Sequence, residues 1–478
     1  MAGTLSTRFP RPDRKALFLG LRPAQLALLV FMVLAVAVAA LSQSGAAVRL
    51  SVFAAGLAAG VVAAVPMEGM PAYRWILLRG AHHLRRHRRQ QSFRARPLAP
   101  RVRGSLHLPG QAGSLRVLDT KHSIAVIHDP HRRRITAIAR IESPAHLLQN
   151  SDQQDRRVVE YGRMIASLCH GGRVARAQII ERTLPDSGDG LTTWANERNL
   201  DPTTPTGAVY AELLQRAAPA SARHETLFGL SLSLDAISRD ARRYGGGLAG
   251  AVAVLEAETR AFQFSFSAAG VGGVWLTAPQ LATSLRLAFD PAAAKVVDRA
   301  YVELDLAAAG PLAIDADWDH LRTDSSFHRV YVIAEWPRVR ATPSFLSPLL
   351  LKPGVRRTFS IVLQPVPIGR ALRDARRDRV ERLTDRATRA RLGQLETEQD
   401  KQIEADVAQR EADLAAGHGD VRWVGLLVVS ADDLEALNDS CNELENAASQ
   451  ALLDMRKLVG QQAEAFLAAS LPFGSGLE

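Results

Sequence analysis

Two uncharged apolar stretches decide the architecture of this chain: AQLALLVFMVLAVAVAAL (Ala24–Leu41) and LSVFAAGLAAGVVAAV (Leu50–Val65). They are 18 and 16 residues long, close to the length that crosses a hydrocarbon core of about 30 Å. Both are apolar on every face, and their flanks are rich in basic residues. This pattern predicts a pair of transmembrane helices rather than two buried core helices. A long basic segment before the first run, and a second run soon after it, argue against a cleaved signal peptide.

Basic residues concentrate around the two apolar runs. The 478 residues include 59 Lys or Arg and 49 Asp or Glu, and residues 1–118 alone hold 17 basic and two acidic residues. The remaining 360 residues carry a net charge of −5, so the overall charge of +10 reflects the membrane flanks. Lys and Arg in short flanks mark the cytoplasmic side. We therefore expect a plasma-membrane protein with two spans and both termini in the cytoplasm.

A dense basic block, HHLRRHRRQQSFRAR (His82–Arg96), follows the second run. We expect it to contact anionic lipid headgroups, where each basic residue contributes about 1 kcal/mol. Contact with DNA has less support because Phe93 is the only aromatic residue in the block, and stacking on single strands uses aromatic side chains; the sequence leaves direct DNA contact open. The residues assigned to this membrane-flank cluster are Arg85, Arg86, Arg88, Arg89, Arg94 and Arg96.

A GxxxG spacing, Gly56 and Gly60, lies in the second apolar run. Small residues four apart let two membrane helices approach closely, although the spacing arises easily in an Ala/Gly-rich run. We assign both glycines to packing between the two helices.

Beyond about Leu115 the pattern changes to mixed α and β structure. The runs Ser123–His128 and Arg134–Ile141 predict a β-hairpin. The segment Gly369–Ala416 is rich in charged residues and predicts a charged helical hairpin that bends near Gly393, or one long helix, with either a solvated face or a protein contact. The chain closes with a predicted strand (Trp423–Ser430), a helix, a strand-like run (Gln450–Leu458) and a final helix, and this order suits a ferredoxin-like sandwich.

The predicted fold class is therefore α+β, with an amino-terminal transmembrane hairpin. The predicted regions are a basic cytoplasmic N-terminus (1–23), the hairpin (24–66), a basic juxtamembrane segment (67–114), a cytoplasmic α+β domain (115–368), the charged helices (369–417) and a ferredoxin-like βαβα end (418–478).

The sequence assigns no catalytic, cofactor-binding or metal-binding residue. The triple glycine Gly245–Gly247 is not followed by the Gly-Lys-Ser/Thr of a phosphate-binding loop. The acidic cluster IDADWDH (Ile314–His320) begins like a calcium loop but lacks its glycine and distal glutamate. The histidines of His82–His87 stand among arginines, which repel a cation. Two cysteines, Cys169 and Cys441, are too few for a disulfide framework or a cysteine-rich zinc site.

Three features together resemble a known family. FPRPDRKALFLGL (Phe9–Leu21) directly precedes the apolar hairpin, RTFSIVLQPV (Arg357–Val366) precedes the charged helices, and FLAASLPFG (Phe466–Gly474) closes the chain. The hairpin resembles the PrgI-type membrane component of Gram-positive conjugative type IV secretion systems. The rest resembles the amino-terminal domain of the CagE/TrbE/TraC-type secretion ATPases. Membrane proteins of this fused layout occur in conjugative elements of actinobacteria.

The resemblance implies a non-catalytic scaffold subunit of a DNA-transferring type IV secretion channel. In the ATPases, the nucleotide-binding domain follows the region that matches Leu471-Pro472. The resemblance therefore implies a separate ATPase subunit, further channel subunits as partners and an oligomeric complex. Two alternatives remain open: an EccE-like membrane component of a type VII secretion complex, and a membrane-tethered enzyme with an unrecognised site.

Overall fold

The computed structural model describes residues 9, 23–42, 45–96, 102–118, 120, 122–143, 149–186, 193, 195–198, 201, 203–217, 222–300, 304–391 and 398–476. It has mixed α+β structure with two apolar helices near the N-terminus, which confirms the fold class at that level. Most of the predicted basic N-terminus and much of the loop that connects Pro185 to Pro205 lie outside the described residues.

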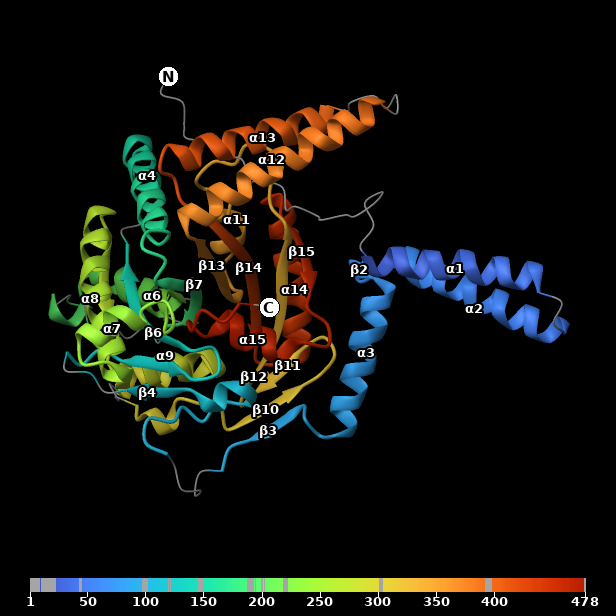
Figure 1. The fold of residues 1–478 in the computed structure, drawn as a ribbon. Helices are drawn as coiled ribbons and strands as arrows, with labels where there is room; N and C mark the ends of the chain where they lie inside the picture. Colours follow the sequence, from blue (N-terminus) through green and yellow to red (C-terminus); the bar gives the residue numbers. More distant parts are fainter. Residues whose placement is uncertain are drawn as a thin grey trace.

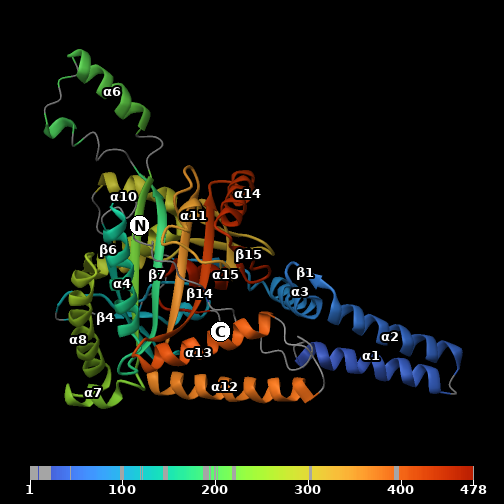
Figure 2. The ribbon, with the colours of Figure 1, turned by 90° about the horizontal axis from the view of Figure 1, so that it is seen from above.

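The apolar helices α1 (Pro23–Leu41) and α2 (Ala46–Ala64) pair lengthwise and project away from the rest of the molecule (Figure 1). Each has 19 residues and so is about 28 Å long at the 1.5 Å rise of an α-helix. The short strands β1 (Pro66–Met67) and β2 (Met70–Pro71) then turn the chain into α3 (Ala72–His87). Figures 1 and 2 show α3 crossing the direction of the hairpin and running along the side of the globular part.

Among the described residues, thirteen strands form one sheet, and its neighbouring strands pair antiparallel. The main path runs β3-β10-β11-β12-β14-β13-β7-β8-β6-β5-β4, with β15 also beside β12 and β9 also beside β6. The strands are β3 (Ser92–Arg94), β4 (Arg116–Leu118), β5 (Val126–Asp129), β6 (Arg134–Glu142), β7 (Val174–Pro185), β8 (Ala222–Ser233), β9 (Gly272–Trp275), β10 (Ala313–Ala316), β11 (Leu321–Thr323), β12 (Ser326–Glu335), β13 (Arg356–Val366), β14 (Asp420–Ala431) and β15 (Asp454–Lys457).

The helices of the globular part connect these strands. They are α4 (Ser151–Ser167), α6 (Pro205–Ala217), α7 (Ser238–Arg243), α8 (Gly247–Ala268), α9 (Ala278–Phe289), α10 (Ala294–Ala300), α11 (Ser347–Leu350), α12 (Ile368–Arg391), α13 (Glu398–Ala415), α14 (Leu434–Gln450) and α15 (Gln462–Ser470).

The same arrangement of strands and helices occurs twice in the described chain. Unit one comprises residues 134–289. Along the chain its main elements follow in the order β6-α4-β7-β8-α8-β9, and α9 comes next; within the sheet its strands lie in the order β9-β6-β8-β7. Unit two comprises residues 326–470. Along the chain its main elements follow in the order β12-α11-β13-β14-α14-β15, and α15 comes next; within the sheet its strands lie in the order β15-β12-β14-β13. The two units join through the antiparallel pair β7 and β13.

Alternating side chains of the sheet build two helix-covered faces. On β14, Leu427 and Val429 belong to a core cluster with α11 and α14, whereas Leu426 and Val428 belong to another with α9 and α15. This alternation is the period of two expected of a strand buried on both sides. Ile361 of β13 packs against both the α14 cluster and the α4–α8 cluster. The units therefore carry α4, α8, α11 and α14 on one face, and α9 and α15 on the other.

Each unit has a long connection between its second and third strands. In unit one it contains α6, and in unit two it contains α12 and α13 (Figure 2). Because β7 and β13 are antiparallel neighbours, the two connections leave opposite ends of the sheet. The bend predicted at Gly393 lies outside the described residues.

The strands predicted for the closing segment pair with distant strands. β14 lies between β12 and β13, and β15 pairs with the other side of β12. The sheet therefore continues across the predicted regional limits at 368 and 418, because strand partners are chosen by packing and not by nearness in sequence. The strand-like pattern of Gln450–Leu458 is shorter in the structure, since Gln450 ends α14 and only Asp454–Lys457 forms a strand.

Candidate membrane and docking surfaces

Helices α1 and α2 approach closely along the glycine face of α2. Gly56 and Gly60 are both buried there. A Cβ atom added at Gly56 would lie 2.9 Å from the Ala35 Cβ, and one added at Gly60 would overlap the Met32 sulfur. A larger side chain at Gly56 would therefore push the helices apart, whereas one at Gly60 would first displace the flexible Met32 side chain.

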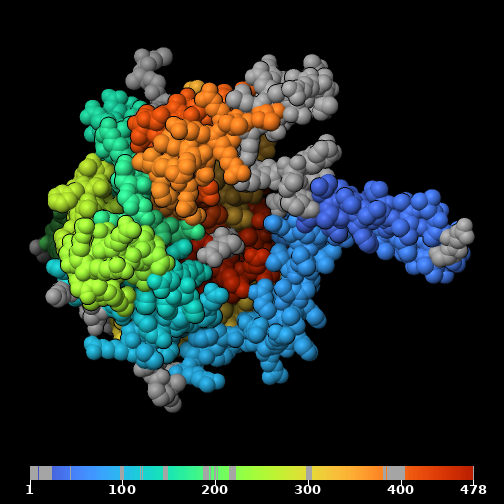
Figure 3. All heavy atoms as spheres, in the orientation of Figure 1, coloured from blue at the N-terminus to red at the C-terminus, as the bar shows by residue number. Residues whose placement is uncertain are grey.

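The outer surface of the hairpin is apolar and exposed. The exposed fraction is 84% for Leu41, 71% for Leu50 and 58% for Leu34. Both helices are long and apolar enough to cross a membrane. Exposure of so much apolar area to water is unfavourable, whereas hydrocarbon is a suitable environment for it. Figure 3 shows the hairpin as a projection from the globular part.

Helix α3 attaches the hairpin to the globular part through arginine contacts. Arg85 forms an ion pair with Glu464 of α15 and donates a hydrogen bond to the Gly460 carbonyl oxygen at 2.8 Å. The Arg79 guanidinium lies 4.6 Å from the ring centre of Trp318, in the turn between β10 and β11. This distance permits a cation–π interaction. The inner face of α3 is thus attached both to unit two and to the β10–β11 hairpin that leads into it.

A histidine lies at the centre of this contact. His82 is buried, its ring meets Trp318 edge-on at 5.2 Å, and its Nδ1 lies 2.9 Å from Gln91 Nε2. Burial lowers the pKa of His82, so its ring is neutral near pH 7 and adds no charge to the arginine-rich contact. Beside it is a hollow of about 300 Å³, lined by Arg79, His82, His83, Arg86, Asp317 and Trp318.

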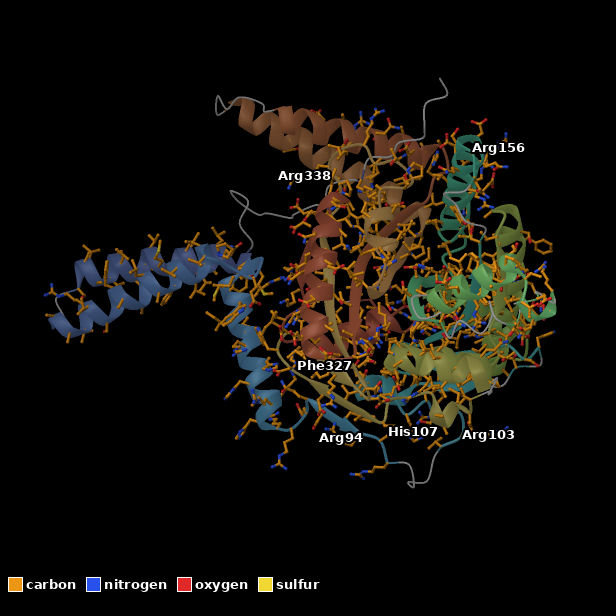
Figure 4. The ribbon with its side chains drawn as sticks, turned by 180° about the vertical axis from the view of Figure 1, so that it is seen from behind. Arg94, Arg103, His107, Arg156, Phe327 and Arg338 are labelled. Carbon is orange, nitrogen blue, oxygen red and sulfur yellow. The ribbon has the colours of Figure 1, made fainter. Side chains whose placement is uncertain are left out.

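The structure divides the arginines assigned to the membrane flank. Arg85 and Arg94 contact the globular part. Arg94 donates two hydrogen bonds from Nη2 to the carboxylate of Asp315, at 2.8 and 2.9 Å, where β3 pairs with β10 (Figure 4). Arg86, Arg88, Arg89 and Arg96 are exposed to solvent, and Arg94 is also exposed although it pairs with Asp315.

The acidic cluster Ile314–His320 is used in ion pairs. Asp319 accepts hydrogen bonds from His320 and from Arg329, both at 2.9 Å. The hydrogen bond from His320 and the charge of Arg329 lower the pKa of Asp319 to about 2. Asp315 pairs with Arg94 instead. Within the described residues, no group of three His, Cys, Asp or Glu side chains is arranged to hold a metal ion.

The Leu-Pro motif near the end of the chain lies in the core where the two units meet. Leu471 is fully buried. Gln178 of β7 donates hydrogen bonds to Ser360 Oγ at 2.9 Å and to the Ala468 carbonyl at 2.8 Å, and its Oε1 accepts one from the Gly474 amide at 2.9 Å. One buried amide thus holds β7, β13 and the closing segment together.

Phe9 lies among aromatic side chains of unit two and the loop inside it. Its ring centre is 5.1 Å from Trp336, 5.3 Å from Phe345 and 6.5 Å from Trp423. Aromatic rings at these separations attract one another. A residue that precedes α1 therefore contacts the same globular part that follows α2.

Sequence reasoning missed three of these residues as contact sites. Phe9 was part of the recognised motif without an assigned partner, and Trp318 lay inside the cluster tested for calcium. Gln178 gave no signal, because its role depends on strands far apart in the chain.

Comparison of the sequence with protein-family models finds no match, and comparison with curated proteins finds no significant similarity.

Proposed function

We propose that this protein is a non-catalytic membrane scaffold of a conjugative type IV secretion channel, and that it docks a separate ATPase. The observation that supports the proposal is the continuous connection from the apolar hairpin to the globular part. The apolar hairpin leads directly into α3, and α3 is attached to unit two through Arg85 and Glu464. The resemblance of Phe9–Leu21 and the hairpin to PrgI-type proteins, and of the rest to the CagE/TrbE/TraC amino-terminal domain, points to this machine.

Two observations support a topology with both termini in the cytoplasm of a plasma-membrane protein. Antiparallel pairing of α1 and α2 brings both ends of the hairpin to one side of the membrane. Phe9 packs against Trp336 of the globular part, so the residues before and after the hairpin share a side. The basic flanks favour the cytoplasmic side.

Within this proposal, each unit is a ferredoxin-like βαββαβ module. The connection containing α12 and α13 is a charged insertion into the second module, and we propose it as the ATPase docking surface. The insertion joins two strands that face each other directly, since Val366 pairs with Asp420. Its helices are held together by ion pairs such as Arg379 with Glu411. By contrast, much of the closing segment is used in the core, including β14 and Leu471.

Excision of the insertion tests the proposal. Residues 367–419 are replaced by an Asn-Gly turn, which suits a two-residue connection between antiparallel strands. The tagged variant is purified from its native membrane, and the proteins that accompany it are identified. We expect the ATPase to accompany the unaltered protein, and its recovery with the excision variant to fall at least about tenfold, because the complex loses its proposed docking surface and a tenfold loss of affinity corresponds to only about 1.4 kcal/mol.

Unit one supplies a matched control. Pro185 pairs with Ala222, so residues 186–221, which include α6, can be replaced by the same turn. This variant should retain the ATPase. Equal retention by both variants would place the docking surface elsewhere. Recovery of type VII components, or of no ATPase with the unaltered protein, would contradict the proposed function.

A further inference from the structure

Helix α3 has a second face that is apolar and exposed. The exposed fraction is 48% for Ile76, 68% for Leu77 and 50% for Leu84, and Gly80 and Ala81 between them are also exposed. Residues three and four apart share one side of a helix, so these positions form a continuous stripe, which we call the α3 apolar row. The opposite side carries Arg79, His82 and Arg85, which contact the globular part.

The apolar row begins where the hairpin ends. The Ala72 amide donates a hydrogen bond to the Val65 carbonyl at 3.0 Å, so the first residue of α3 is held at the end of α2. From there α3 crosses the hairpin direction instead of continuing it (Figures 1 and 2). If the hairpin spans a bilayer, α3 lies at headgroup level and roughly in the membrane plane.

The charges beside the row fit an anionic surface. Arg74, Arg88 and Arg89 are exposed along or just beyond the helix, and the sequence contains no acidic residue between Glu68 and Asp119. A helix with leucines on one side and arginines at its borders suits the interface of an anionic leaflet, with its apolar side about 5–10 Å into the headgroup boundary.

We propose that α3 is a membrane-surface helix, with Ile76, Leu77 and Leu84 inserted into the headgroup region of an anionic cytoplasmic leaflet. The inference rests on the membrane anchoring in the proposed function and deepens it. An inserted α3 holds unit two beside the bilayer, because Arg79 and Arg85 on its other side attach it to the globular part. The domain then has a defined orientation to the membrane instead of swinging on a flexible tether.

Lipid-quenching fluorescence tests the insertion. Single cysteines are introduced as Leu77→Cys or Leu84→Cys in the full chain and labelled with an environment-sensitive dye; the two native cysteines are buried. The protein is reconstituted in vesicles of phosphatidylcholine and phosphatidylglycerol that contain lipid brominated near the headgroup. Each label should be quenched at least about twofold more strongly than a label at Phe264→Cys, because only an inserted side chain meets the bromines. Phe264 is apolar and 80% exposed, and it belongs to α8, which lies on the opposite side of the globular part from the hairpin (Figure 1).

A label on α2 separates failure of this inference from failure of membrane anchoring. Leu57 is 55% exposed on the outer face of α2, so Leu57→Cys should be quenched by lipid brominated deep in the acyl chains. Quenching at Leu57, together with quenching at Leu77 and Leu84 that is no stronger than at Phe264, would contradict the insertion of α3. The α3 apolar row would then be a candidate contact for a protein partner instead. Absence of quenching at Leu57 would contradict the membrane hairpin itself.

Discussion

Unit one and unit two share a strand order but differ in what they contact. The contacts of Phe9, Arg79 and Arg85 fall on unit two or on the β10–β11 hairpin that leads into it. Unit one lies farther from the hairpin, at the end of the sheet where Figure 1 shows α4 and α8. The same arrangement of strands and helices therefore contacts the segments that flank the apolar hairpin in unit two, whereas in unit one it lies away from the hairpin.

The buried polar groups of the two units differ as well. In unit one the ion pair between Arg182 and Glu225 is buried, and Arg182 also donates to the Ser284 carbonyl oxygen at 2.8 Å. Unit two instead buries a histidine: His328 Nδ1 lies 2.8 Å from Ser430 Oγ. Two units with the same topology thus stabilise their interiors with different polar groups. Residue chemistry therefore varies independently of the fold, and the fold alone does not assign function.

The largest effect should come from breaking the charged centre of unit one. Burial opposes ionisation of Glu225, but Arg182 and Arg140 lower its pKa, so the carboxylate is charged in the folded protein. Glu225→Ala leaves Arg182 buried without its main partner, and we expect a loss of about 3–5 kcal/mol in unfolding free energy. Denaturant unfolding of the full chain in detergent measures it.

A paired variant shows whether the charge is responsible. Glu225→Ala combined with Arg182→Met removes both charges and should recover most of the lost stability. A double variant no more stable than the single one would mean that packing, and not the uncompensated charge, dominates this site.

An intermediate effect should appear at acidic pH through unit two. Burial lowers the pKa of His328 to about 3, below its ordinary value near 6.5, so the folded protein resists protonation. The unfolded chain takes up this proton as pH falls below about 6.5, and stability falls by about 1.4 kcal/mol per pH unit until pH approaches 3. The cost is about 2 kcal/mol at pH 5.

The measurement compares unfolding free energies of the native protein and His328→Gln between pH 7 and pH 5. The variant should lose stability more slowly with falling pH, because glutamine does not titrate. Glu225, whose pKa is lowered in the folded protein, loses its contribution to stability only as pH falls through the ordinary carboxylate range, and this loss is the same in both proteins, so it cancels in the comparison. Equal slopes in the two proteins would show that His328 takes up its proton without unfolding.

The smallest effect concerns the contact of Phe9 with unit two. A double-mutant cycle with Phe9→Ala and Trp336→Ala should give a coupling free energy of about 0.5–1.5 kcal/mol, as for other close aromatic pairs. The matched cycle of Phe9→Ala with Phe264→Ala in unit one should give no coupling, because independent sites add. If the first cycle also gives no coupling free energy, the Phe9 contact no longer supports placing the N-terminus and the globular part on the same side of the membrane.

Local patterns in the sequence predicted much of the secondary structure. The run Arg134–Ile141 lies within β6, and Trp423–Ser430 lies within β14, because alternating or continuous apolar residues are typical of strands. The twofold repeat of the strand order was not predicted, since the units differ in their first helix, long α4 against short α11. The arginines of His82–Arg96 were recognisable as basic, but the choice of Arg85 and Arg94 for protein contacts depends on Glu464 and Asp315, far along the chain.

The sequence by itself determined the apolar hairpin, the basic flanks and the α+β class, because each depends on hydrophobicity, charge or periodicity within a short window. Only the tertiary structure decided that β7 pairs with β13, that Gln178 holds the segment around Leu471, and that Phe9 meets Trp336. These contacts join residues far apart in sequence. They form because buried polar groups need hydrogen-bond partners and because aromatic side chains pack against one another. Neither requirement produces a pattern in the neighbouring residues of the sequence.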